Sequence, residues 1–176
     1  MREIVGAIEG EYRRYKALGD KAIEQLDEGQ LCAAAGQGNS LAAIFWHVSG
    51  NLASRFTDFL GSDGEKPWRD REDEFRARIV SRMELLAKWE AGWAVLHGAL
   101  ASLDDPALPR TVTVRGVGLS VLEALLRSLS HTSYHVGQIV FLAKALRGGE
   151  WRYLTIPPGG SAAYNANPFA EKAPRS

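Results

Sequence analysis

Four long segments with apolar residues at every third or fourth position constrain the fold of this chain more than any other feature of its sequence. They cover roughly residues 2–26, 41–60, 74–103 and 121–146. An α-helix completes a turn in 3.6 residues, so this spacing places the apolar side chains of each segment on one face. Four amphipathic helices that must each bury a face predict an all-α four-helix bundle.

The side chains expected to face the core follow directly from this spacing. In the first two segments they are Ile4, Ile8, Tyr12, Tyr15, Leu18, Ala22 and Leu26, followed by Leu41, Ile44, Phe45, Val48, Leu52, Phe56 and Phe59. In the last two they are Ile79, Met83, Leu86, Trp89, Trp93, Leu96 and Leu100, followed by Leu122, Leu125, Leu126, Leu129, Val136 and Val140.

Local signals mark several helix ends. Asn39 and Ser40 are good caps for the second helix, and Ser120 with Glu123 forms the S-x-x-E capping box that opens the fourth. Gly148 and Gly149 end that helix.

The connection "GSDGEKPWRDRED" is rich in Gly, Pro and charge and is longer than a tight turn requires. It predicts that the second and third helices are joined by a long crossover rather than as a hairpin. We expect Trp68 to be tucked onto the bundle. A lid that offers Arg69 and Arg71 to carboxylates is the alternative. The segment "RTVTVRGVG" alternates Thr and Val and predicts a short extended piece.

The chain reads as a single domain, residues 1–176, with a C-terminal tail at residues 146–176. Adjacent prolines and several glycines predict that the tail is not helical. Because Trp151, Tyr153, Leu154 and Ile156 are apolar, we expect the tail to pack across the bundle or against a partner subunit. The last residues, "AEKAPRS", should stay mobile.

The composition excludes several classes of partner. Lys and Arg number 21 and Asp and Glu also number 21, so no net charge attracts nucleic acid or an anionic membrane. No apolar run approaches the ~20 residues of a membrane span, and no signal peptide is apparent. The single cysteine, Cys32, favours a reducing compartment. We therefore expect a cytoplasmic protein.

Three of the four histidines point to a metal site. His131 and His135 are four residues apart, so both rings can converge on one ion. Both lie near the border between the apolar and polar faces of the fourth helix, and His47 has a similar place on the second. Three imidazoles with one open position for water or thiolate are typical of catalytic sites. An isolated H-x-x-x-H also occurs by chance, and "HTSYH" lacks the glutamate of a metalloprotease.

Other polar residues are candidates for supporting roles. Glu90 is expected on the core face of the third helix, either as an acceptor for a ligand imidazole or as the partner of an arginine. His97, on the same face, should be a buried and hydrogen-bonded residue rather than a ligand. Further candidates for catalysis are Tyr134 and Gln138, and those for substrate binding are Asn51, Arg55, Trp68 and Arg69.

Several stretches resemble the DinB-like superfamily, which includes YfiT-like metal-dependent hydrolases and thiol-dependent transferases, and most closely a branch of unknown function. They are "SLAAIFWHVSGNLASRFTDFL", "DGEKPWRDREDEF", "KWEAGW", "SHTSYHVGQIVFLAKAL" and "WRYLTIPPGGSAAYN", and they span most of residues 40–165. The resemblance implies a four-helix bundle whose metal ligands match His47, His131 and His135.

Three functions follow as expectations. Characterised relatives imply a metal-dependent enzyme that uses a low-molecular-weight thiol, of the S-transferase or isomerase type. A metal-dependent hydrolase is the first alternative, and a non-catalytic metal-binding or dimerisation module is the second. The cofactor would be one divalent ion (zinc, nickel, manganese or iron), and the substrate a small molecule. A homodimer is expected, because the Trp- and Phe-rich segments hold more apolar surface than one small bundle buries.

Overall fold

A computed structural model describes residues 1–34 and 38–167 of the chain. The fold is mostly helical, with one small antiparallel sheet of two strands. The helices are α1 (Glu3–Ile23), α2 (Glu28–Cys32), α3 (Leu41–Phe56), α4 (Arg71–Glu74), α5 (Arg82–Ala101), α6 (Val121–Arg147) and α7 (Ser161–Ala166). The strands are β1 (Thr111–Val114) and β2 (Val117–Ser120), and two 3₁₀ turns occupy Asp105–Ala107 and Gly148–Glu150.

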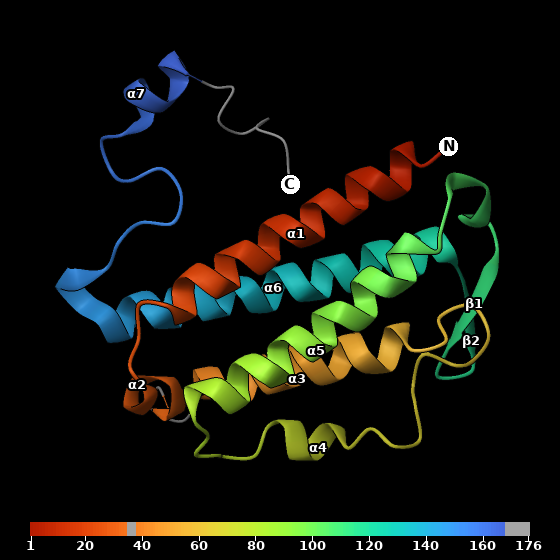
Figure 1. The fold of residues 1–176 in the computed structure, drawn as a ribbon, viewed down its shortest axis with the longest axis horizontal. Coiled ribbons are helices and arrows are strands. Elements are labelled where there is room, and N and C mark those ends of the chain that lie inside the picture. Colours follow the sequence, from red (N-terminus) through yellow and green to blue (C-terminus); the bar gives the residue numbers. More distant parts are fainter. Residues whose placement is uncertain (35–37, 168–176) are drawn as a thin grey trace.

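The long helices α1, α3, α5 and α6 lie side by side, with the hairpin β1–β2 at one end (Figure 1). α3 packs along α5, α1 packs along α6, and α3 also contacts α6. Because α3 and α5 run in the same direction, residues 57–81 must return along the molecule before α5 can begin (Figure 1). This returning segment contains α4, which packs against α3.

The close approach of α3 and α5 depends on Gly92. A Cβ atom at this position would lie 2.8 Å from both the Cα and the carbonyl oxygen of Ser49. Real Cβ atoms do not approach backbone atoms so closely, so only glycine lets the two helices meet here. Around this contact the core is built on large buried side chains, including Tyr12, Phe45, Trp89 and Trp93.

The helix-start signals were correct at two sites. The Ser40 side chain accepts a hydrogen bond from the backbone N–H of Ala43, and Ser120 with Glu123 forms the expected capping box. The predicted start of the third long helix near residue 74 was wrong. Residues 71–74 form the separate helix α4, and α5 begins only at Arg82, capped by Ser81.

Four residues expected in the core are exposed instead. Ile79 and Met83 are 96% and 80% exposed, since they lie before and at the start of α5, where no other helix covers them. Ile4 in the first turn of α1 is 49% exposed, and Leu126 on the outer side of α6 is 47% exposed. The second long helix also ends earlier than expected, at Phe56, because Thr57 leaves the helical conformation.

The extended piece predicted from "RTVTVRGVG" is present and forms both strands of the hairpin. Arg115 and Gly116 make the two-residue turn with positive φ values of 55° and 74°, as this type of hairpin requires. The carboxylate of Asp63 accepts hydrogen bonds from the backbone N–H groups of both turn residues. The segment after α3 is therefore tied to the hairpin.

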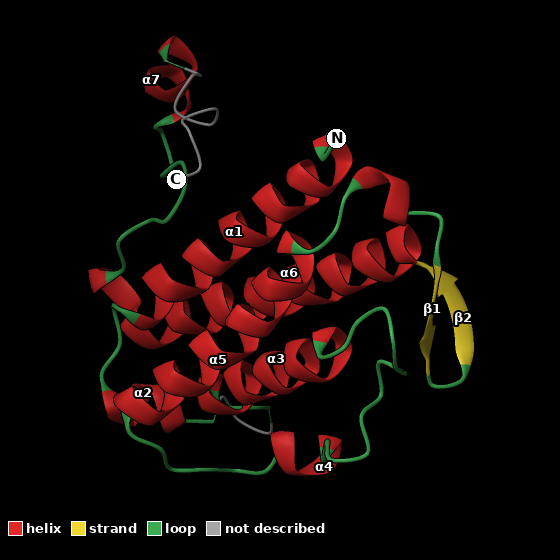
Figure 2. Cartoon of the chain, turned by 45° about the vertical axis from the view of Figure 1, so that its right-hand side comes forward, coloured by secondary structure: helices red, strands yellow, loops and turns green. Residues whose placement is uncertain are grey.

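The C-terminal tail differs from the expectation that it holds no helix, because residues 161–166 form α7. Trp151 and Leu154 pack against the core, whereas Tyr153 and Ile156 are 46% and 39% exposed. Gln25 holds the beginning of the tail through two hydrogen bonds to the backbone of Arg152. α7 stands apart from the long helices (Figure 2). The stretch "AEKAPRS" lies outside the described residues.

None of the helices in residues 1–34 and 38–167 combines the length and the apolar character that crossing a bilayer would require.

Candidate metal centre

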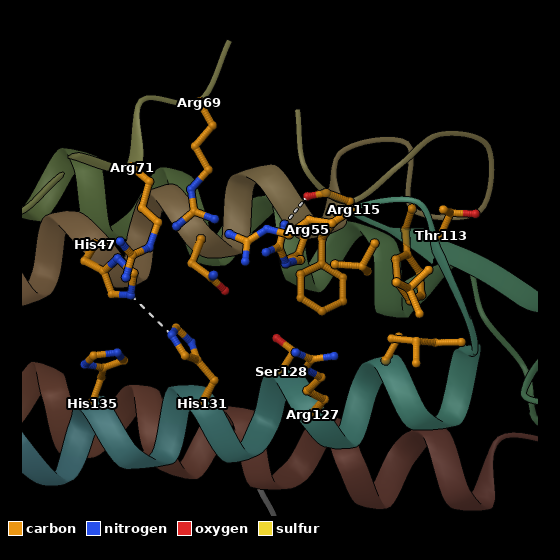
Figure 3. A pocket seen from close by; sticks show the side chains of 18 of the residues that line it. His47, Arg55, Arg69, Arg71, Thr113, Arg115, Arg127, Ser128, His131 and His135 are labelled. Atoms are coloured by element: carbon orange, nitrogen blue, oxygen red, sulfur yellow. Dashed lines mark hydrogen bonds between the residues drawn. The ribbon is translucent and has the colours of Figure 1, made fainter. Parts of the chain in front are cut away.

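His47 on α3 and the pair His131 and His135 on α6 meet between these two helices (Figure 3). One ring nitrogen from each histidine can be chosen so that all three lie within 4.8 Å of one another. His47 is buried, and the other two are half-buried. The sequence pattern therefore located three imidazoles that the fold brings together, and they are the one such group of His, Cys, Asp and Glu within the described ranges.

The ring of His47 is fixed by the segment that returns between α3 and α5. Its Nδ1 donates a hydrogen bond to Oε2 of Glu74 over 2.8 Å, and its ring lies 4.4 Å from that of Phe75, centroid to centroid. Arg69 donates two hydrogen bonds of 2.8 Å to the same carboxylate. Glu74 is only 5% exposed, and the side chain of Arg69 only 2%.

Burial alone would raise the pKa of Glu74, but the hydrogen bonds from Arg69 and His47 outweigh it and hold that pKa below its ordinary value. Glu74 is therefore a carboxylate at neutral pH. Because its oxygen accepts the proton of His47 Nδ1, the lone pair of His47 is left on Nε2, which faces the other histidines.

A glycine on α3 leaves room for this carboxylate. A Cβ atom built on Gly50 would overlap Oε1 of Glu74. Any larger residue would push Glu74 away from His47, so the position of the carboxylate is set by both α4 and α3.

His135 is fixed in a similar way, because its Nδ1 lies 2.8 Å from Oε1 of Gln138 on the next turn of α6. This contact again places the ring proton on Nδ1 and leaves Nε2 as the ligand atom. The Nε2 atoms of His47 and His131 are 3.2 Å apart, so an Nε2–H of His131 can donate a hydrogen bond to the lone pair on His47 Nε2. His131 Nδ1 is buried and has no hydrogen-bond partner within the described part of the chain.

The environment keeps the half-buried pair neutral. Burial, reinforced by the neighbouring His135 and His47, lowers the pKa of His131 to about 3. Burial and His47 also lower the pKa of His135. Neutral imidazoles held together at neutral pH are the form in which histidine binds metal.

The donor set fits a divalent ion. Bonds of about 2.1 Å in tetrahedral geometry separate two nitrogen ligands by about 3.4 Å, close to the 3.2 Å between Nε2 of His47 and Nε2 of His131. Three neutral nitrogen ligands suit zinc, nickel or iron better than manganese, calcium or magnesium, which prefer oxygen.

The histidines form one end of a cavity of about 550 Å³. On α3 the lining residues His47, Asn51 and Arg55 follow one another at intervals of four. On α6 the lining residues Arg127, His131 and His135 do the same. Side chains four apart lie on one helix face, and Figure 3 shows the arginines of both rows on the same side of the histidines. The rest of the lining includes five apolar side chains, which are Phe56, Phe59, Val114, Val117 and Leu119.

The other sequence candidates have different places. Asn51, Arg55, Arg69 and Tyr134 line the cavity, whereas Gln138 contacts His135 from outside the lining. Trp68 was wrongly expected to be tucked onto the helices. It is 58% exposed and is absent from the lining.

Two placements on α5 were also wrong. Glu90 was expected on the core face, but its side chain is 59% exposed and pairs with Lys16 of α1 at 2.6 Å. It therefore has no contact with a ligand histidine. His97 is half-buried and stacks on Trp93, and its Nδ1 has no hydrogen-bond partner within the described residues, contrary to the expectation for this ring.

Glu74 and Arg127 are the residues that sequence reasoning missed. Arg127 lies four positions before His131, so the same spacing that joined the two histidines could have found it. Glu74 carried no such signal, because its contact with His47 depends on the path of the returning segment.

Comparison with known proteins gives one family match. Residues 2–160 match the family described as "Protein of unknown function (DUF1572)". Comparisons with curated proteins and with solved structures found no match.

Proposed function

This chain belongs to the DUF1572 family, whose function is unknown. From the geometry of the histidine cluster, we propose that the protein binds one divalent metal ion through His47, His131 and His135 and acts as a metal-dependent enzyme on a small molecule. The fold would be a four-helix bundle of the DinB-like type, with α1, α3, α5 and α6 as its helices. The sequence resemblance and the side-by-side packing of these helices support this assignment.

The observation that carries the proposal is the buried pair of Glu74 and Arg69 that holds the ring of His47. Surface histidines that meet by chance do not have a buried carboxylate and a buried guanidinium behind them. Here Glu74 is buried against His47 and is itself held by Arg69. Burying charged groups is costly unless they are paired, and hydrogen bonds of this kind orient metal-ligating histidines in proteins.

Different residues of the chain would have different roles in this function. Glu74 and Gln138 hold the rings of His47 and His135 with Nε2 directed inward. A bound divalent ion would supply Lewis-acid activation of a nucleophile at the histidine end of the cavity. Apolar side chains such as Phe56 and Phe59 would pack against the apolar part of a substrate, and polar side chains such as Asn51 would orient it.

We propose a low-molecular-weight thiol as the co-substrate, in S-transfer or thiol-assisted isomerisation. The proposal rests on the superfamily resemblance and on a donor set without thiolate or carboxylate, which leaves the ion its full charge for an anionic sulfur. The cavity volume, within the ~300–1,000 Å³ of small-molecule sites, leaves room for such a ligand.

Turnover of an electrophilic substrate by the metal-loaded protein tests the proposal. Small thiols should be consumed with metal present, and the rate should fall to background after chelation and in His135→Ala. Turnover of an ester without thiol would favour a hydrolase instead. Metal binding without turnover of either substrate would leave a metal-binding module.

A further inference from the structure

The charged side chains in the cavity wall all carry positive charge. Among the described residues that line it, five are arginines and none is aspartate or glutamate. These arginines are Arg55, Arg69, Arg71, Arg115 and Arg127. A wall of this kind creates a positive potential inside a space that also has apolar surfaces.

Carboxylates behind the wall neutralise only part of this charge. Glu65 pairs with Arg55 and Arg115 and also lies 3.9 Å from Arg69, so one negative charge serves three guanidinium groups. Arg69 is paired with Glu74, yet its Nη1 is buried and has no hydrogen-bond partner within the described residues. Arg127 forms no ion pair or hydrogen bond with any described residue.

A polar side chain that is nine-tenths buried faces the same space. Asn51 is 9% exposed, lines the cavity between His47 and Arg55, and makes no side-chain hydrogen bond with another described residue. Buried amides are seldom left without partners unless water or a ligand supplies them.

The two rows of side chains give the cavity a direction. His47 and Arg55 are two turns apart on α3, and His131 and Arg127 are one turn apart on α6. A helical turn spans about 5.4 Å. The backbone of Arg127 therefore lies about one turn from that of His131. The apolar side chains Phe56 and Phe59 follow Arg55 in the chain and line the same cavity.

We propose that the cavity binds an organic anion, a carboxylate or a phosphate monoester, whose charged group lies between Arg127 and Arg55. The Asn51 amide donates a further hydrogen bond to it, and the apolar part of the ligand packs against Phe56, Phe59 and the hairpin. This inference adds a substrate class to the function proposed above and rests on it only for the placement of the reacting group beside the histidines.

The test uses the full-length protein freed of metal by chelation, so that an anion cannot bind to the ion itself. Hexanoate, hexyl phosphate and hexanol are titrated by calorimetry. The two anions distinguish a carboxylate site from a phosphate site, and the alcohol measures the apolar contribution. At least one anion should bind about tenfold more tightly than hexanol, as expected for charge-assisted hydrogen bonds.

Arg127→Gln should weaken binding of the preferred anion about tenfold. Arg147→Gln is the matched control, because Arg147 is on the same helix but outside the cavity, and it should bind as the wild type does. Arg127 is exposed, so its replacement should leave the circular dichroism melting curve unchanged.

Equal binding of anion and alcohol, unchanged binding in Arg127→Gln, an equal loss in Arg147→Gln, or no binding at millimolar concentrations would each overturn the inference. Metal content measured on the same preparations keeps the two proposals apart. A protein that binds anions through Arg127 but holds no metal would refute the proposed function and retain the anion site.

Discussion

Replacing Glu74 with Gln separates a supported metal site from a chance meeting of histidines. The substitution keeps the size of the side chain but removes its charge. Glu74 receives three hydrogen bonds of 2.8 Å, two from Arg69 and one from His47. Because an amide has one oxygen and a donating NH₂ group, at most part of this set can be kept in Glu74→Gln.

The expected magnitudes follow from burial. The side chain of Arg69 is 2% exposed, so the mutation leaves a buried cation whose remaining carboxylate partner, Glu65, is 3.9 Å away. Removing one partner of a buried pair costs about 3–5 kcal/mol, and we expect about 3 because the amide oxygen retains one acceptor. His47 also loses the charge that orients it, which should weaken metal binding about 10- to 100-fold.

Urea unfolding of the metal-free protein, followed by tryptophan fluorescence, gives the stability change, and competition with a chromophoric chelator gives the metal affinity. Glu72→Gln is the matched control on the same short helix. Its side chain is 84% exposed and pairs only with Arg71, so its effect should stay below about 0.5 kcal/mol. A loss under about 1 kcal/mol in Glu74→Gln, together with metal affinity within about threefold of wild type, would refute the reasoning.

Three further outcomes follow from the structure. Gly92→Ala should destabilise the protein by about 3 kcal/mol in urea unfolding, because the added Cβ meets the backbone of Ser49. Gly98→Ala is the control, since Gly98 is on the same helix but faces open space, and it should gain up to about 1 kcal/mol of stability. Burial and neighbouring histidines lower the pKa of His131 to about 3, while the unfolded chain titrates near 6.5, so between these values the unfolded state binds more protons. The metal-free wild type should therefore lose stability as the pH falls from about 6.5 towards 3, and urea titrations of His131→Gln should show a smaller loss; equal losses would contradict the assignment. The expected homodimer should appear in light scattering at micromolar concentration. Phe141→Ser removes an apolar side chain that is 77% exposed and should shift the equilibrium towards the monomer. A monomeric wild type would reject the dimer.

Local signals predicted the elements that local physics controls. The caps at Ser40 and Ser120 were correct because a cap is a contact between residues three apart. The pairing of His131 and His135 was correct for a similar reason, since positions four apart on a helix are neighbours whatever surrounds them.

The errors come from contacts between distant segments. Ile79 and Met83 continue the spacing of α5 backward, so periodicity alone extended that helix to residue 74. In the fold, residues 71–74 belong to a separate helix that supports His47. The same limit led to Glu90 in place of Glu74, because no local pattern shows which carboxylate the returning segment brings to a histidine 27 residues away.

Metal analysis of the full-length protein, purified without chelator and dialysed after loading with a single divalent ion, tests the central claim most directly. The wild type should retain about one ion per chain, and His131→Ala and His47→Ala should each lose most of it, since two imidazoles seldom hold such an ion tightly. His97→Ala should retain the ion, because His97 stacks on Trp93 and is not part of the histidine cluster. Full retention in His47→Ala, with loss in His97→Ala, would contradict the account.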